Sequence, residues 1–120
     1  MNIQIKEIEN KKYIELVSTA NPLGSEQDAL DCIGLCFEHE TNLVMIHYSA
    51  LSEDFFRLQT KVAGDILQKF INYNIKTVAI IPNEVMQKGR FREMALETNK
   101  GHHFRMYEDK EEAKQWLLAQ

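Results

Sequence analysis

The chain has 120 residues and a formal net charge of −4, and 44% of its residues are hydrophobic while 27% are charged. This composition is that of an ordinary globular domain, which excludes a disordered chain, a collagen-like chain and a disulfide-stapled miniprotein. A chain of this length has room for one core, so we expect one domain over residues 1–120. A weakly acidic domain also lacks the concentrated basic face that sequence-independent nucleic-acid binding requires, so we expect no nucleic-acid partner.

The expected location is the cytoplasm, without a membrane partner. The sequence shows no run of the roughly 18–20 apolar residues that span a bilayer. The charged segment 1–12 lacks the apolar stretch of a signal peptide. Cys32 and Cys36 lie four residues apart in a helical pattern, where a disulfide is disfavoured. They are interpreted as small buried hydrophobic residues in a reducing compartment.

The first third of the chain predicts a strand, a strand and a helix. Alternating apolar and polar residues indicate strands over residues 2–8 and 12–17, joined by a hairpin turn at Asn10 and Lys11. Ser25 follows turn residues and precedes acidic residues, as an N-cap does. We therefore predict an amphipathic helix over residues 26–40.

The rest of the chain alternates strands and helices. A continuous apolar run over residues 43–48 predicts a strand that is covered on both faces. Ser52 is predicted to cap a long helix that extends to about Tyr73. The remaining predicted elements are a buried strand over 75–81, a helix over 91–99, an edge strand over 103–107 and a helix over 110–119 that begins after the cap Asp109. The order β-β-α-β-α-β-α-β-α predicts an α/β fold, a single compact domain with a mixed, mostly parallel sheet and right-handed crossovers.

The apolar arc of the predicted long helix is wider than one packed face requires. If Ile66 faces the sheet, Phe56, Leu67 and Ile71 project to one side of it. A neighbouring helix can cover this second arc, or the arc can form a homodimer contact. Gly64 lies within the same helix, where it costs about 1 kcal/mol relative to alanine. We therefore expect a close approach to the backbone at Gly64, which favours a partner face.

Candidate ligand residues follow the strand over 43–48, because ligands of open α/β sheets bind outside the carboxyl ends of the strands. His47 is either a general base or a hydrogen-bonded core histidine. Ser49 and Ser52 are either phosphorylation sites near a helix start or a loop residue and an N-cap. Asp54 and Arg57 belong to the same loop and helix start.

Gln59 falls within the sheet-facing stripe of the predicted helix. A buried amide needs partners, so Gln59 either bonds the strand ends or lines a pocket. Basic residues also gather around the third helix, where they can meet an acidic partner or a phosphate, or form a solvated mixed face. This basic group consists of Lys88, Arg90, Arg92, Lys100 and Arg105.

The common catalytic motifs are absent from the sequence. It contains no phosphate-binding loop, dinucleotide-binding glycine motif, nucleophile elbow or H-E-x-x-H metal motif. His102 and His103 are adjacent and therefore point to opposite sides of an extended chain, which disfavours a shared metal. We expect no catalytic residue, no metal and no cofactor.

Three segments carry a family resemblance. They are Gln27-Asp28-Ala29-Leu30-Asp31, the stretch from Asp54 to Tyr73, which includes Asp54-Phe55-Phe56 and Ala63-Gly64, and the stretch from Phe91 to the motif Glu97-x-Asn99-Lys100-Gly101. Through them the chain resembles domain-of-unknown-function family 4180, a family of small bacterial cytoplasmic proteins without an assigned activity. The motif at residues 97–101 can also be a helix stop in which Asn99 and Gly101 take left-handed backbone angles.

The element order resembles the STAS domain, the fold of anti-sigma-factor antagonists, which implies a regulatory role. In that family a serine in a D-x-S-G context is phosphorylated by a partner kinase. Here the segment Tyr48-Ser49-Ala50-Leu51-Ser52 contains serines without that aspartate and glycine.

Two functions follow. The first is a non-catalytic STAS-like module that binds a protein partner or a second copy of itself, either through Phe56, Leu67 and Ile71 or through the edge 49–57. The second is a small enzyme or ligand-binding protein with a pocket of roughly 300 Å³ or more at the strand ends. That pocket would be built from His47, Ser49, Asp54, Arg57 and Gln59.

Overall fold

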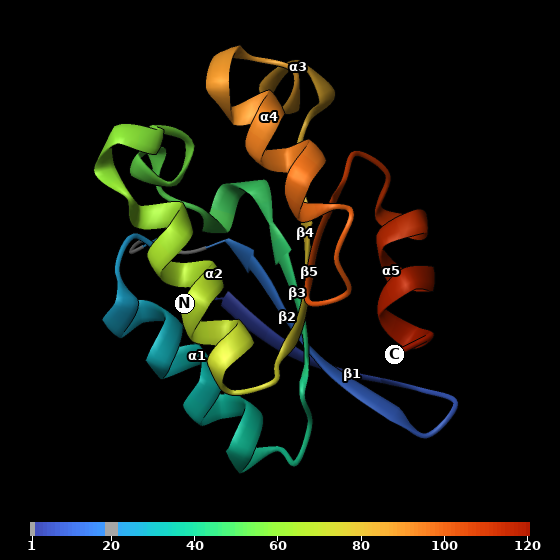
Figure 1. Ribbon diagram of the computed structural model, residues 1–120. Helices are drawn as coiled ribbons and strands as arrows, with labels where there is room; N and C mark the ends of the chain where they lie inside the picture. Colours follow the sequence, from blue (N-terminus) through green and yellow to red (C-terminus); the bar gives the residue numbers. More distant parts are fainter. Residues whose placement is uncertain (1, 19–21) are drawn as a thin grey trace.

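The computed structural model describes residues 2–18 and 22–120 and contains one five-stranded sheet in the order β1-β2-β3-β4-β5 (Figure 1). β1 is antiparallel to β2, and the other neighbouring strands are parallel. The strands are β1 (Asn2–Ile8), β2 (Lys11–Ser18), β3 (Leu43–His47), β4 (Lys76–Ile80) and β5 (Phe104–Tyr107). The predicted α/β class and mixed, mostly parallel sheet are confirmed.

The helices cover the two faces of the sheet unequally. They are α1 (Glu26–Glu38), α2 (Val62–Asn72), α3 (Asn83–Met86), α4 (Gly89–Thr98) and α5 (Lys110–Leu118). The longer helices α1, α2 and α4 pack against one face, whereas α5 alone packs against the other (Figure 1). Because β2 to β5 lie side by side in chain order, each right-handed crossover places its helices on the same face. None of the helices in the described ranges is long and apolar enough to cross a membrane.

Strand alternation divides the core in two. On β3, Val44 and Ile46 point toward α1 and α2, whereas Leu43 and Met45 point toward α5. The α5 side is the smaller cluster and also contains Tyr13, Val78, Ala113 and Leu117. A strand with both faces covered appears in the sequence as a continuous apolar run, which is why β3 was predictable.

The predicted long helix over 53–73 is wrong in its first half. Three short 3-10 turns precede α2: η1 (Tyr48–Ala50), η2 (Glu53–Phe56) and η3 (Leu58–Thr60). Lys61 then takes a left-handed conformation with φ 64°, which a continuous α-helix cannot contain. Consequently Gln59 does not lie on a sheet-facing stripe, and its side chain is exposed.

Gly64 lies in the first turn of α2, and the close approach expected there is wrong. The residue is exposed, and a Cβ atom at this position would meet no described atom within 4 Å.

Two of the three predicted N-caps make the expected hydrogen bond. Ser25 and Asp109 accept hydrogen bonds from the backbone N–H groups of Asp28 and Glu112, as expected of N-caps. Ser52 occupies the predicted N-cap position, but of the short turn η2 and not of a long helix, and its side chain makes no capping bond.

The edge of the sheet at β5 is closed by a side chain. The Asn99 amide donates to the Met106 carbonyl at 2.9 Å, and its oxygen accepts from the Met106 N–H at 2.7 Å. Asn99 thus imitates a neighbouring strand. Its φ of −72° is right-handed, and Gly101 is not among the residues with positive φ, so the left-handed helix stop proposed for this motif is wrong.

We expect Thr77→Val to raise the free energy of unfolding by about 1–2 kcal/mol. Thr77 is fully buried in β4, and its hydroxyl has no hydrogen-bond partner among the described residues. Valine keeps the shape of the side chain and removes the unpaired polar atom. Urea denaturation measures the change, with Thr77→Ser as a control that keeps the hydroxyl and loses a methyl group. A less stable valine variant would show that the hydroxyl is paired in solution.

Candidate functional site

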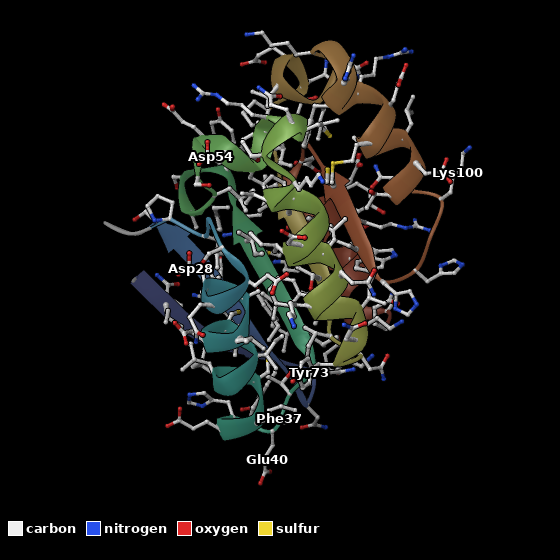
Figure 2. The ribbon with its side chains drawn as sticks, turned by 60° about the vertical axis from the view of Figure 1, so that its left-hand side comes forward. Asp28, Phe37, Glu40, Asp54, Tyr73 and Lys100 are labelled. Carbon is white, nitrogen blue, oxygen red and sulfur yellow. The ribbon has the colours of Figure 1, made fainter. Side chains whose placement is uncertain are left out.

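The five polar residues predicted to form a strand-end pocket do not converge. The Ser49 hydroxyl donates to the Val17 carbonyl at 2.5 Å, so it joins the loop to β2. The Asp54 side chain is exposed on the outside of its turn (Figure 2). Gln59 is exposed. His47 contacts Glu15 on the face of the sheet that α5 covers, and α2 covers the other face. Of the five, Arg57 alone lines the groove described next.

An open groove of about 370 Å³ lies where β3 and β4 end. It is lined by Tyr48, Glu53, Phe56, Arg57, Val85 and Lys88, and we call it the edge groove. Its apolar floor is held by aromatic rings packed at tilted angles. The ring of Phe56 lies 5.2 Å from that of Tyr48 and 4.9 Å from that of Phe91, measured between centroids. Because Phe55 and Phe91 are buried beneath this floor, the groove is preformed.

The rim of the edge groove is positively charged. Arg57 lies 3.4 Å from Glu53, but both side chains are mostly exposed, so this ion pair contributes little. Lys88 is exposed and forms no salt bridge with any described residue. Lys88 also precedes α4, whose first turn contains no acidic residue. The groove is therefore a local positive surface on a chain of net negative charge.

The structure reveals a buried carboxylate that the sequence analysis missed. Glu15 on β2 is 2% exposed, and its Oε2 atom lies 2.5 Å from the Nε2 atom of His47 and 3.1 Å from the Nζ atom of Lys110. We call these three residues the Glu15 cluster. It joins β2, β3 and the first turn of α5 on the face of the sheet that α5 covers.

Two opposing effects set the pKa of Glu15. Burial raises the pKa, but hydrogen bonds from His47 and Lys110, together with their charges, outweigh burial and hold the pKa below its ordinary value. The pKa of the neighbouring Tyr13 shifts in the opposite direction. Its pKa is raised first by burial and then by the negative charges of Glu15 and Glu111. The cluster therefore favours a charged Glu15 beside a neutral Tyr13.

A carboxylate bonded to one imidazole nitrogen orients the ring, which is the arrangement of many proton-transfer sites. Nucleophilic catalysis also needs an activated nucleophile within reach of the imidazole. Ser49 is the serine closest to His47 in sequence, and its hydroxyl is already bonded to the backbone. The structure thus supplies an acid–base pair whose partner groups are engaged in holding β2, β3 and α5 together.

Glu15 was missed because it alternates with Ile14 and Leu16 and therefore resembled a residue on a wet face. The pairing of β2 with β3 indicates that Glu15 and His47 are neighbours. Glu15 pairs with Met45, so His47 is the next residue of β3 on the same face. Recognising that β2 and β3 are parallel neighbours would have brought the two side chains together.

The residues of the predicted interaction face do not form one surface, because Phe56 lies in η2 and the others lie along α2. Phe56 belongs to the edge groove, Leu67 is half-buried against the core, and Ile71 is exposed in the last turn. Gly64 lies between them in an open position. Near Ile71, the exposed rings of Phe37 and Tyr73 meet edge to face with centroids 6.3 Å apart, at the ends of α1 and α2 (Figure 2).

The described residues contain no group of three or more histidine, cysteine or carboxylate side chains that could hold a metal. Lys100 and Glu97 of the loop motif form an exposed ion pair at 3.4 Å. Cys32 and Cys36 are free and buried. A hydrogen bond with Cys36, together with burial, raises the pKa of the Cys32 thiol, so Cys32 is not a thiolate at neutral pH.

The comparisons with known proteins give one result. The family model described as Domain of unknown function (DUF4180) matches residues 8–117, which confirms the resemblance inferred from the sequence motifs. The comparisons with curated proteins and with solved structures give no match.

Proposed function

Because the chain belongs to the Domain of unknown function (DUF4180) family, whose description assigns no activity, we propose its function from its surface: a non-catalytic, STAS-like cytoplasmic module that binds a protein partner. The observation that carries this proposal is the edge groove, which has an aromatic floor and two cationic side chains on its rim. A catalytic pocket would instead gather several polar side chains around one point. The mostly parallel five-stranded sheet is compatible with the STAS-like part of the proposal.

The proposed occupant of the edge groove is an acidic segment of a partner protein that inserts one large apolar side chain. The floor of Tyr48, Phe56 and Val85 suits such a side chain. Arg57 and Lys88 suit carboxylates on either side of it. Glu53 is the one acid on the rim, and its weak pairing with Arg57 is easily exchanged for a partner carboxylate.

We expect Arg57→Glu/Lys88→Glu to reduce recovery of the partner at least tenfold in affinity purification from the native host, because reversing both charges repels an acidic segment. Cross-linking mass spectrometry of the complex should join the groove to an acidic peptide that contains an aromatic residue or leucine. The matched control is Lys12→Glu/Lys100→Glu, which changes the net charge equally at exposed positions outside the groove. Equal losses in both variants, or cross-links to a basic peptide, would contradict the proposal.

Phosphorylation, if it regulates this module, is expected at Ser49 rather than at Ser52. Ser49 is exposed beside Tyr48 of the groove, whereas the Ser52 hydroxyl is buried. A phosphate on Ser49 would add negative charge near a groove that binds acids and would weaken binding. Mass spectrometry of the protein purified from its host tests this expectation.

A second candidate function is ligand binding or acid–base catalysis at His47, which the Glu15 cluster favours. Amide NMR spectra recorded during a fragment screen separate the two candidates. Fragments that shift the signals of His47 and Ser49 would support the second candidate. Fragments that shift Tyr48, Arg57 and Lys88 would support the edge groove.

A further inference from the structure

The outer edge of β1 carries unpaired backbone groups. The turn between β1 and β2 consists of Glu9 and Asn10, with φ values of 51° and 69°, which is a two-residue hairpin turn. In such a hairpin the flanking pair, here Ile8 and Lys11, exchanges both hydrogen bonds, and bonded pairs then alternate along the ladder. The backbone N–H and C=O groups of Ile3, Ile5 and Glu7 therefore point away from β2.

No described element pairs with these groups, because β1 is the first strand in the sheet order. The opposite edge is different, since the Asn99 side chain occupies the backbone of Met106 on β5. Proteins commonly protect an open edge with proline, a bulge, charged side chains or a covering loop. β1 has no proline, and its one irregularity lies at the Asn2/Ile3 end. Its two charged residues, Lys6 and Glu7, are of opposite sign, and Ile5 at its centre is 41% exposed.

We propose that β1 pairs antiparallel with β1 of a second copy of this chain, centred on Ile5, to form a two-fold symmetric dimer with a continuous ten-stranded sheet. In this register Ile5 lies opposite Ile5 of the copy, and Ile3 lies opposite Glu7. All three are the residues whose backbone groups point outward, so each opposing pair exchanges two hydrogen bonds. A two-fold axis closes the assembly, which leaves no further β1 edge to extend it.

The side chains of β1 favour a second copy as the occupant. Ile3 and Ile5 lie on the same face of β1. In the proposed register they form one apolar stripe with the same two residues of the copy, which covers the exposed Ile5. On the other face Lys6 lies opposite Gln4, so no two like charges are directly opposed. The strand thus places its central isoleucines together and opposes no like charges, with Glu7 beside Ile3 of the copy at each end of the apolar stripe.

Sedimentation equilibrium tests the dimer. We expect the wild type to have twice the mass of one chain, and Ile5→Pro to be a monomer, because proline removes an outward N–H without breaking a bond to β2. Glu7→Pro is a second variant of the same design. The matched control is Ile5→Val, which keeps the N–H and is expected to remain a dimer. Circular dichroism verifies that each variant is folded, and a monomeric wild type would overturn the proposal.

Cysteine cross-linking tests the register. Ile5→Cys should form an intermolecular disulfide on mild oxidation, because directly opposed residues have Cα atoms about 5.5 Å apart. Glu7→Cys should not, because position 7 lies four residues from its own copy along the strand, or about 14 Å. Cys32 and Cys36 are buried, so the wild type gives the background. Equal cross-linking of both variants, or cross-linking of Glu7→Cys alone, would refute the register centred on Ile5.

Discussion

We expect Phe55→Ala to lower the free energy of unfolding by about 3–5 kcal/mol, which is the largest single effect of any substitution considered for this chain. Phe55 is fully buried, and its ring lies 5.2 Å from Phe56 and 6.2 Å from Phe91 between centroids. It joins η2 to α4, which are otherwise linked through the half-buried Phe56. Alanine would leave a cavity beneath the edge groove and release the segment between β3 and α2.

Urea denaturation measures this effect, and Tyr48→Ala is the matched control. Tyr48 packs against Phe56 in the same cluster but is 43% exposed, so its loss should cost less than about 1.5 kcal/mol. The two variants also separate stability from binding. Tyr48→Ala should weaken partner binding while the protein stays folded. A Phe55→Ala variant as stable as the Tyr48→Ala variant would show that the turns 48–60 reorganise without cost.

The second large effect is expected at the Glu15 cluster. His47→Leu should lower the free energy of unfolding by about 2–3 kcal/mol at neutral pH, because it leaves a buried carboxylate whose one remaining partner among the described residues is Lys110. Glu15→Leu/His47→Leu should recover most of this loss, because no unpaired charge is then buried. Additive losses in the double variant would show that packing, rather than charge, dominates at this position.

The pH dependence has opposite signs in the two proteins. In the wild type the pKa of Glu15 is held below its ordinary value of 4.5, so its contribution to stability is complete above that value and is lost as the pH falls through the lower folded value. In His47→Leu, burial should dominate and raise the pKa of Glu15. Acidification should then protonate Glu15 and reduce the cost of the substitution. Thermal unfolding at pH values between neutral and acidic measures both trends.

The strands were predictable because each carries a simple pattern. β3 is a continuous apolar run, since both of its faces are covered, and β5 alternates, since one side of it is wetter. The N-caps Ser25 and Asp109 were predictable because a local side-chain bond defines each of them. The hairpin turn was placed one residue late, since its positive φ values fall on Glu9 and Asn10.

Residues 48–60 were not predictable, because distant contacts override their helical periodicity. Phe55 and Phe56 match a helical stripe, yet both rings pack onto Phe91 from another element. The backbone of Leu51 also forms an isolated bridge with Leu23, which holds the segment extended at that point. The candidate site changed accordingly. Of the predicted site residues, Arg57 does line a groove, whereas Gln59 is exposed on the surface. Glu15 was not predicted as a site residue, because a single sequence does not show which residues are neighbours across strands.

The strand order has a consequence for how the molecule assembles. Each strand pairs with the one before it in the chain, so during synthesis a hairpin forms first and the sheet grows at one edge as each new helix and strand emerges. No early strand waits for a late one. The exception is the face over Tyr13, Leu43 and Met45, which stays uncovered until α5 arrives. A ribosome-bound chain halted before α5 would therefore hold a near-complete sheet with one exposed apolar face. This intermediate should be the species that chaperones recognise.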